Sequence, residues 1–372
     1  MSAALRFRVA GAGLLAALVA AACAPATAAP ATAPGPAGSS AGSGAVPARL
    51  SETGLFADLA AQTLAPGVLS FSPQYPLWSD GARKRRWIRL PAGAAIDASD
   101  PDDWSFPVGT RLWKEFALDR PIETRMLERT ADGWTFAAYV WSADGADATL
   151  APANGIPRFC DSTPGVPYDV PSVADCRACH LTSGRTPVLG FTALQLSDDR
   201  DPLAPHAEPP PPGAVTLSGL LERGLLRGLP ARHLGAPPRI RATTPRGRAA
   251  LGYLAANCGT CHAGGGPLEP LGLELHAPLD DAAYGALPAL STGVGRLGRY
   301  RMPGTTHDAP RIAPGAPELS TLLLRMRSRD PAVQMPPLGT HAVDVDALAL
   351  LEAWVREDLA PRGTTQTDFV LR

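Results

Sequence analysis

The pattern of apolar and polar side chains predicts β-strands at residues 84–90, 111–116, 121–130 and 134–141. Within residues 122–127 the alternation suits a strand with one buried face. Asp132 and Gly133 separate this segment from a second run that is rich in aromatic residues, and such a pair is typical of a hairpin turn. We therefore expect residues 49–160 to form a small antiparallel β domain.

The second half of the chain instead spaces its apolar residues three and four positions apart, as helices with one buried face do. Thr244 and Pro245 form a typical helix start, with threonine as the N-cap and proline in the first turn. Near the other end, Asp344 or Asp346 can cap a helix whose apolar face holds Leu348, Leu351 and Val355. The fold class we expect is α+β with several domains, in which a mainly α-helical region follows the β domain.

The first 48 residues fit neither pattern. Arg6 and Arg8 precede an apolar run over residues 9–22, which is the outline of a secretory signal peptide. Residues 24–48 are almost entirely Ala, Pro, Gly, Ser and Thr, and such a segment cannot bury enough apolar surface to fold. We expect a flexible linker there, with the rest of the chain outside the cytoplasm.

Cys23 ends the apolar run, and the residues before it resemble the lipobox of bacterial lipoproteins. The resemblance implies that residues 1–23 are a signal peptide ending in a lipidated Cys23, and that the protein lies in the periplasm. The following residue is alanine rather than aspartate, which favours a lipid anchor in the outer membrane. Ala20 stands where a larger aliphatic residue is usual. Ordinary cleavage after an Ala26-x-Ala28 site, or an uncleaved anchor, are the alternatives.

Charge excludes one class of partner. The 372 residues hold 34 basic and 35 acidic side chains, so the chain lacks the basic excess of nucleic-acid-binding proteins. The densest basic cluster, residues 83–86, is expected to be a solvated strand edge. We therefore expect no nucleic acid among its partners.

The cysteines carry the clearest chemical signal. Four of the six form two pairs, and each pair is followed directly by histidine in the order C-x-x-C-H, the attachment motif for c-type haem. Two intervening residues put both thiols on one side of a helical turn, and the histidine can then bind the iron as its proximal ligand. The residues concerned are Cys176, Cys179 and His180 for a first haem, and Cys258, Cys261 and His262 for a second.

Other uses of paired cysteines fit less well. Disulfides suit an exported protein but do not require a histidine after each pair. A zinc site built from two such pairs has them much closer in sequence, and a thioredoxin-like pair needs a βαβ context that this pattern lacks. The predicted cofactors are therefore two covalently bound haem c groups. Cys160 has no obvious partner once Cys23 is lipidated, and it is a candidate for a buried free thiol.

A proline follows each motif at a similar distance, at Pro187 and Pro270. A histidine that binds a metal ordinarily donates its other ring N–H to a carboxylate, a carbonyl or water, which orients the ring. The carbonyls of these two prolines are candidates for that role toward His180 and His262.

Residues 243–372 hold the second motif and, over about residues 243–360, resemble a class I cytochrome c domain. In that family a helix leads into the haem motif, a methionine in a Met-Pro-Pro loop closes the other side of the iron, and a C-terminal helix packs across the first. The resemblance implies His262 as proximal ligand and Met335 as distal ligand. This ligation raises the reduction potential and leaves no open position on the iron. Met302, which precedes a Pro-Gly pair, is a competitor.

The first haem-binding segment, residues 161–242, contains no methionine. His206 and His233 are its local candidates for a distal ligand, while His307 or His341 from the other segment, another group, or no ligand at all stay open. Two ligands on each iron mean pure electron transfer, with no catalytic residue. An open position on the first iron would instead permit the chemistry of a diheme peroxidase-like enzyme, which is the alternative.

From residue 50 to about residue 356 the chain resembles a family of uncharacterised exported diheme c-type cytochromes of Gram-negative bacteria, many of lipoprotein type. Besides the two haem motifs, the matching landmarks are residues 54–56, 106–110 and 139–141. The resemblance implies a periplasmic electron carrier with two haems, whose partners are redox proteins of the periplasm and a membrane reached through the lipid anchor. It does not identify the electron donor or acceptor.

Overall fold

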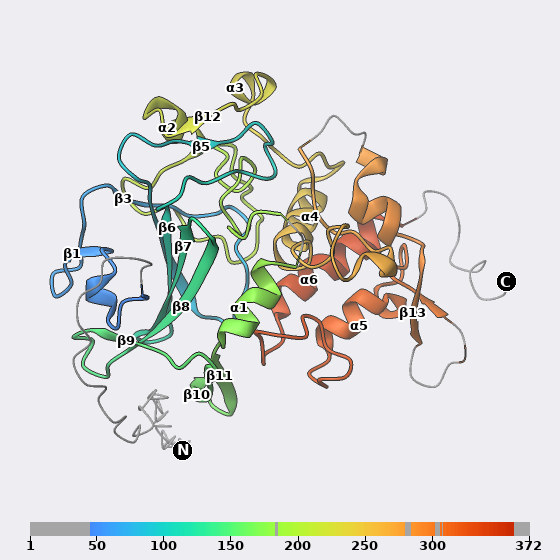
Figure 1. Cartoon of the computed structure of the whole chain (residues 1–372). Coiled ribbons are helices and arrows are strands. Elements are labelled where there is room, and N and C mark those ends of the chain that lie inside the picture. Colours follow the sequence, from blue (N-terminus) through green and yellow to red (C-terminus); the bar gives the residue numbers. More distant parts are fainter. Residues whose placement is uncertain (1–44, 183–184, 280–283, 302–305, 307, 361–372) are drawn as a thin grey trace, which may run out of the picture.

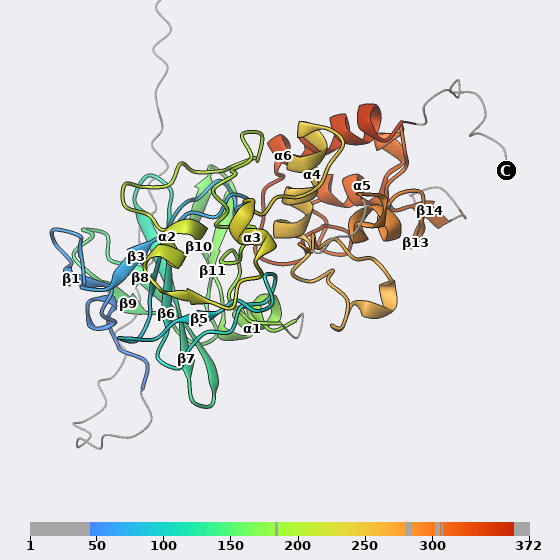
Figure 2. The same ribbon diagram turned by 90° about the horizontal axis from the view of Figure 1, so that it is seen from above.

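The computed structural model describes residues 45–182, 185–279, 284–301, 306 and 308–360, in which strands and helices are both abundant (Figure 1). The predicted mixed α and β content is therefore confirmed. The longer strands gather on one side of the molecule, and the C-terminal helices lie on the other, together with the short strands β13 and β14 (Figure 1, Figure 2). The signal peptide, Cys23, nearly all of the linker, Met302 and His307 lie outside the described residues. No helix in the described ranges is long and apolar enough to cross a membrane.

The main sheet has six antiparallel strands in the order β3-β4-β6-β7-β8-β9. The two strands of the predicted hairpin, β7 and β8, pair from Glu123↔Val140 to Thr130↔Gly133. The hairpin is thus where the pattern placed it, but its two loop residues are Ala131 and Asp132, one position earlier than predicted. The bounds are β3 Val68–Ser70, β4 Arg83–Arg89, β6 Arg111–Ala117, β7 Pro121–Thr130, β8 Gly133–Trp141 and β9 Ala148–Leu150.

The described residues also form four two-stranded sheets. One of them pairs residue 96 in parallel with residue 226, so the strand-rich part of the chain is joined directly to the first haem-binding segment. Another crosses the boundary predicted at residue 160. The pairs are β1 Phe56–Asp58 with β2 Thr63–Leu64, β5 Ile96–Asp97 with β12 Leu226–Arg227, β10 Ile156–Thr163 with β11 Val166–Val170, and β13 Leu297–Arg301 with β14 Asp308–Pro310.

The helices begin where the capping residues predict. Thr244 accepts a hydrogen bond from the Gly247 N–H at the start of α4, and Asp344 does the same for the Ala347 N–H at the start of α6, so Asp344 is the cap rather than Asp346. Helix α4 packs against α6. The helices are α1 Val173–His180, α2 Leu217–Glu222, α3 Arg232–Gly235, α4 Pro245–Asn257, α5 Thr321–Arg327 and α6 Val345–Ala353, with shorter helical turns at Leu50–Glu52, Glu269–Leu271, Tyr284–Ala286, Ala289–Gly293, Pro317–Leu319 and Trp354–Asp358.

One hydrophobic core extends across the boundaries predicted at residues 160 and 242. Its members include Ile88 and Leu112 on the sheet, Phe191 and Leu220 in the first haem-binding segment, and Leu254 and Trp354 in the C-terminal segment. A smaller core around Trp87, Trp113 and Tyr139 covers the opposite face of the sheet. Burial therefore fixes one face of the main sheet toward the helical side of the molecule.

Candidate haem-binding site

A partly open cavity of about 730 Å³ lies between that face of the main sheet and helices α1, α4 and α5. Cavities of this size commonly hold cofactors. The predicted residues that line it are Cys176, Cys179, His180, Cys258, Cys261, His262 and Met335. The fold thus brings both C-x-x-C-H motifs and the predicted methionine to one cavity, although the motifs are far apart in sequence.

Helix α1 carries the first motif. Its N-terminus is closed by a reciprocal pair of hydrogen bonds, in which Ser172 Oγ accepts from the Asp175 N–H and the Asp175 carboxylate accepts from the Ser172 N–H, both at 3.0 Å. Positions 176, 179 and 180 are three and four residues apart and therefore lie on one side of the helix. All three positions line the cavity.

His180 is oriented by a backbone carbonyl. Its Nδ1 lies 2.6 Å from the Pro187 carbonyl oxygen, which can only accept, so Nδ1 carries the proton and Nε2 has a free lone pair. Burial lowers the pKa of His180 to about 4, against the opposing effect of the Pro187 carbonyl, and keeps the imidazole neutral. A neutral imidazole held through one nitrogen is the arrangement of a metal-binding histidine. The expected role of Pro187 is therefore confirmed as a contact.

The second motif continues the last turn of α4. A side chain at position 259 would bring a Cβ within 2.6 Å of the Ala255 carbonyl, so only Gly259 fits this turn. The His262 N–H donates to the Cys258 carbonyl at 2.9 Å, which keeps the motif helical.

His262 is 9% exposed, and burial lowers its pKa. Its Nδ1 is buried and makes no hydrogen bond of ordinary geometry, although the Leu273 carbonyl lies close enough to raise the pKa in opposition. The neighbouring carbonyl is thus that of Leu273 and not that of Pro270, which corrects the expectation for the second motif.

Met335 lies in the loop between α5 and α6. Its backbone N–H donates to the Arg325 carbonyl at 3.0 Å, and the Arg325 side chain donates to the Val333 carbonyl at 2.7 Å, so the loop is fastened to the end of α5. Met326 also lines the cavity but is a buried member of the main core. Of these two methionines, Met335 has the loop position that the sequence predicts for a ligand.

The two histidines predicted near the first haem do not line the cavity. His206 Nε2 is bound to the Asp344 carboxylate at 2.8 Å, and its ring packs beside Trp78. His233 belongs to α3, which lies away from α1 (Figure 1). The structure therefore does not bring either candidate to the cavity that holds His180, and His206 is held instead by Asp344.

Two other histidines line the cavity. His341 Nε2 is 2.7 Å from the Asp169 carboxylate, and its backbone N–H donates to Asp80. His276, which sequence reasoning missed, follows the second motif and lies near Glu274. His276 lies in a segment without regular secondary structure, so the sequence has no periodic pattern there that would have identified it.

The expectation of a solvated strand edge at residues 83–86 holds for the exposed Arg83 and Arg85 but is wrong for the other two residues, and β4 is an inner strand of the sheet. Only 6% of Arg86 is exposed and Lys84 is half-buried, because alternate side chains of β4 face the helical side of the molecule. Arg86, Lys114 and Arg125 lie directly opposite one another on β4, β6 and β7 and line the cavity; we call them the cationic row. One pattern in the sequence could have identified the cationic row: each of three predicted strands has one basic residue on the face whose other residues are mostly apolar.

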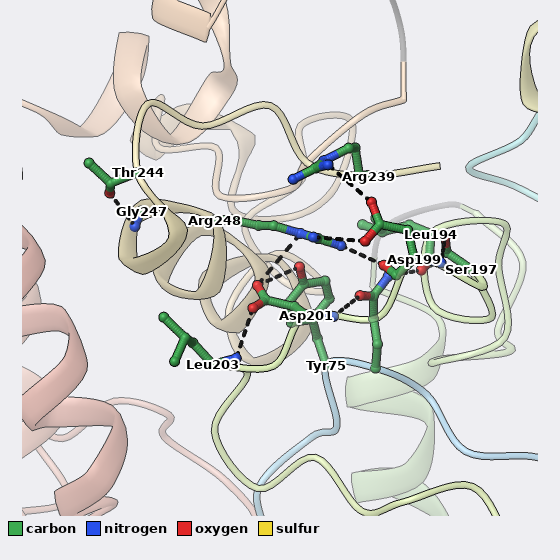
Figure 3. A network of polar contacts seen from close by, with 11 residues as sticks. Tyr75, Leu194, Ser197, Asp199, Asp201, Leu203, Arg239, Thr244, Gly247 and Arg248 are labelled. Carbon is green, nitrogen blue, oxygen red and sulfur yellow. Dashed lines mark hydrogen bonds and ion pairs between the residues drawn. The ribbon is translucent and has the colours of Figure 1, made fainter. Parts of the chain in front are cut away.

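A buried polar network fastens α4 to the segment before it (Figure 3). The Tyr75 hydroxyl donates to Asp201 at 3.0 Å, and Arg248 reaches Asp199 at 3.1 Å and Asp201 at 3.7 Å. Burial raises the pKa of Tyr75, so the phenol remains a donor. The Tyr75 ring also lies against Gly252, where a Cβ would overlap it. This network sets the position of the helix that leads into the second motif.

The four motif cysteines are not disulfide-bonded. Burial raises the pKa of Cys176 and Cys179 and takes that of Cys258 to about 12, so these thiols stay protonated. Cys160, expected as a free thiol, is disulfide-bonded instead. Oxidation suits the compartment that the leader sequence predicts.

Within the described ranges, no three His, Cys, Asp or Glu residues cluster so as to hold a bare metal ion. Haem iron, by contrast, needs at most one protein ligand on each side of the porphyrin. The residues present fit haem better, since a neutral imidazole with one fixed nitrogen and two unpaired thiols occur together in a cavity. Comparisons with models of protein families, with curated proteins and with solved structures find no match.

Proposed function

We propose that this chain is an exported diheme c-type cytochrome that transfers electrons between redox partner proteins in the periplasm. The observation that carries the proposal is that two C-x-x-C-H motifs from distant segments line one cavity. Burial, and after it Cys261, raises the pKa of Cys179, which agrees with the two motifs lying near one another in this cavity. Haems attached at both would lie close together, which favours electron exchange between them.

The first motif would hold its haem through Cys176, Cys179 and His180. Each thiol would add its S–H across one vinyl group of the porphyrin, forming a thioether with no atom lost. The Pro187 carbonyl fixes the imidazole with Nε2 free, and the lowered pKa keeps that nitrogen unprotonated. When bound, the two haems would supply one-electron redox chemistry, and the protein would hold and orient them.

The second haem would be held in the manner of a class I cytochrome c domain. His262 would be the proximal ligand and Met335, from the loop fastened to α5, the distal one. The packing of α4 against α6 is consistent with this domain, since in that family the first and last helices cross. Filling both positions on the iron would suit an electron carrier.

A diheme peroxidase-like enzyme is the second candidate. It is favoured by one observation: neither His206 nor His233 lines the cavity, so neither is placed to close the first iron. Electron paramagnetic resonance of the oxidised protein separates the two functions. Two low-spin centres without peroxidase turnover support the carrier, whereas one high-spin centre with turnover supports the enzyme.

Membrane attachment through a lipid at Cys23 is a separate part of the proposal. It requires the Cys23 thiol to carry the lipid and not a disulfide to Cys160, because one sulfur cannot do both and the four motif cysteines are unpaired. The lipobox-like leader and the Ala/Pro-rich linker support an anchor in the outer membrane with the cytochrome in the periplasm. The resemblance to exported diheme cytochromes of lipoprotein type points the same way.

A pyridine haemochrome assay combined with a redox titration tests the proposed function. The protein is purified from a host that matures c-type cytochromes. We expect a c-type spectrum, two haems per chain and two separable midpoint potentials. A colourless protein from such a host would exclude the proposal.

A further inference from the structure

Three basic side chains lie side by side on the face of the main sheet that forms one wall of the cavity. Arg86 on β4 is directly opposite Lys114 on β6, and Lys114 is directly opposite Arg125 on β7. Like charges in directly opposed positions destabilise a sheet. A row of this kind therefore requires compensating negative charge.

The protein supplies only part of that charge. Arg86 Nη1 is 3.1 Å from the Glu208 carboxylate, but its Nη2 is buried and has no hydrogen-bond partner. Arg125 pairs with the fully buried Glu123. Lys114 forms no ion pair or hydrogen bond among the described residues, and its ammonium lies only over the Phe116 ring, at 4.8 Å. A buried donor left unpaired is costly, so the row is incomplete as it stands.

The accessible side of the row is the cavity itself. All three residues line it, and Lys114 is partly accessible there although it belongs to a central strand. Burial, together with Arg86, lowers the pKa of Lys114 well below its ordinary value, whereas a bound anion would raise it. The donors therefore face a space that can hold a ligand.

The row lies beside the first haem motif. Helix α1 packs on β8, where the Phe136 ring is 5.5 Å from the His180 ring. Cys176 and Cys179 line the same cavity as the cationic row. An anion bound at the row would be close to whatever those thiols hold.

We propose that Arg86, Lys114 and Arg125 form a carboxylate-binding site for the propionate groups of the haem attached at Cys176 and Cys179. The inference rests on the proposed function. Haem carries two carboxylates, which match the donors left over: a guanidinium edge on Arg86 and the ammonium of Lys114. The N-terminal sheet is then a wall of the first haem site, and its cations raise the potential of that haem by favouring the reduced iron.

The test uses the two-haem protein and measures both midpoint potentials and the propionate bending band of the resonance Raman spectrum. Lys114→Gln and Arg86→Gln are expected to shift the midpoint of the first haem to lower potential and to move the band, with the second midpoint unchanged. Lys114→Arg should retain both signals. Arg83→Gln on the exposed side of β4 is the matched control and should change nothing.

Haem content separates failure of this inference from failure of the proposed function. Absence of haem removes the proposed function. Two haems with neither signal altered by Lys114→Gln or Arg86→Gln overturn the propionate site alone. Since Lys114 has no hydrogen bond to lose, its variant should fold, as circular dichroism can check, and Arg86→Gln provides an independent second variant.

Inorganic phosphate distinguishes the haem's own carboxylates from a free anion. If propionates occupy the row, titrating phosphate into the wild-type protein at constant ionic strength leaves the first midpoint unchanged. A phosphate-dependent shift that Lys114→Gln abolishes would show that the row is open to free anions, and would contradict the proposal.

Discussion

At the scale of single residues, the two histidines of the motifs are held differently. His180 has a close hydrogen bond to the Pro187 carbonyl, whereas His262 has a buried Nδ1 near the Leu273 carbonyl without ordinary hydrogen-bond geometry. A stronger acceptor makes a histidine a better electron donor to a metal. The different contacts of the Pro187 and Leu273 carbonyls therefore favour different reduction potentials for haems bound at the two motifs, although the motifs have the same sequence pattern.

Met335 gives the first prediction. Met335→Ala should abolish the methionine-to-iron charge-transfer band and lower the second midpoint, because a thioether ligand raises the potential. Visible spectroscopy of the oxidised protein checks this. Met326→Leu preserves volume in the core and should leave the band intact. A band that survives Met335→Ala but disappears in Met302→Ala would show that the ligand is assigned wrongly.

The sequence predicts the role of a residue when that role depends on its neighbours in the chain. It does not predict a role that depends on contacts with distant residues. The cysteine pairs and their histidines required only neighbours in sequence. The exclusion of His206 depends on Asp344, more than a hundred positions away, and the burial of Arg86 depends on which face of β4 the helices cover. Nothing local encodes either fact.

At the scale of elements, α4 sets the position of the second motif, and its packing depends on a glycine. Gly252→Ala would drive a Cβ into the Tyr75 ring. We expect a loss of about 1–3 kcal/mol in the free energy of unfolding, since overpacking forces the helix or the ring to move. Chemical denaturation measures it.

The matched control is Gly219→Ala in α2, where the nearest atom to a new Cβ is at 3.6 Å. Helix propensity then acts alone, so this variant should be neutral or more stable by up to about 1 kcal/mol. Equal destabilisation of both variants would mean that the contact of α4 with Tyr75 does not matter.

A second prediction for α4 concerns pH. Asp358 accepts from Thr244 at 2.6 Å and from Arg246, which joins the start of α4 to the last helical turn. Burial raises the pKa of Asp358, but these hydrogen bonds outweigh it and the net pKa is lowered. The stabilisation is therefore complete above the ordinary carboxyl pKa of about 4 and is lost as the pH falls through the folded-state value.

Asp358→Asn should accordingly cost about 1–2 kcal/mol at neutral pH, and the difference from wild type should shrink on acidification. Glu357→Gln, which removes a mostly exposed partner of Arg246, should cost less than about 1 kcal/mol. A cost for Asp358→Asn that stays constant down to acidic pH would refute the assignment. Denaturation curves at several pH values provide the comparison.

The strands and helices with a clear period were predictable, and the hairpin turn was displaced by one residue because several turns can join the same two strands. The short strand pairs were not predictable. Strand β5 pairs with β12, and the partners are over a hundred residues apart, with only two residues each. Such pairs form because the rest of the fold brings them together.

At the scale of the whole molecule, one core joins segments that look independent in sequence. Residues of the sheet, of the first haem-binding segment and of the C-terminal helices pack together, and the cavity lies where these parts meet. Both candidate haem sites therefore depend on the intact chain. Composition and periodicity could predict the parts, but not the cavity that their packing encloses.

The central claim is that each C-x-x-C-H motif holds one haem covalently. Intact-protein mass spectrometry tests it on wild type, a Cys176→Ser/Cys179→Ser variant and a Cys258→Ser/Cys261→Ser variant, all matured in the same host. Cys160→Ser controls for loss of a cysteine outside the motifs. We predict two haems on wild type and on Cys160→Ser, and one on each double variant. A wild-type mass equal to the polypeptide alone, or a double variant that keeps two haems, would contradict the account.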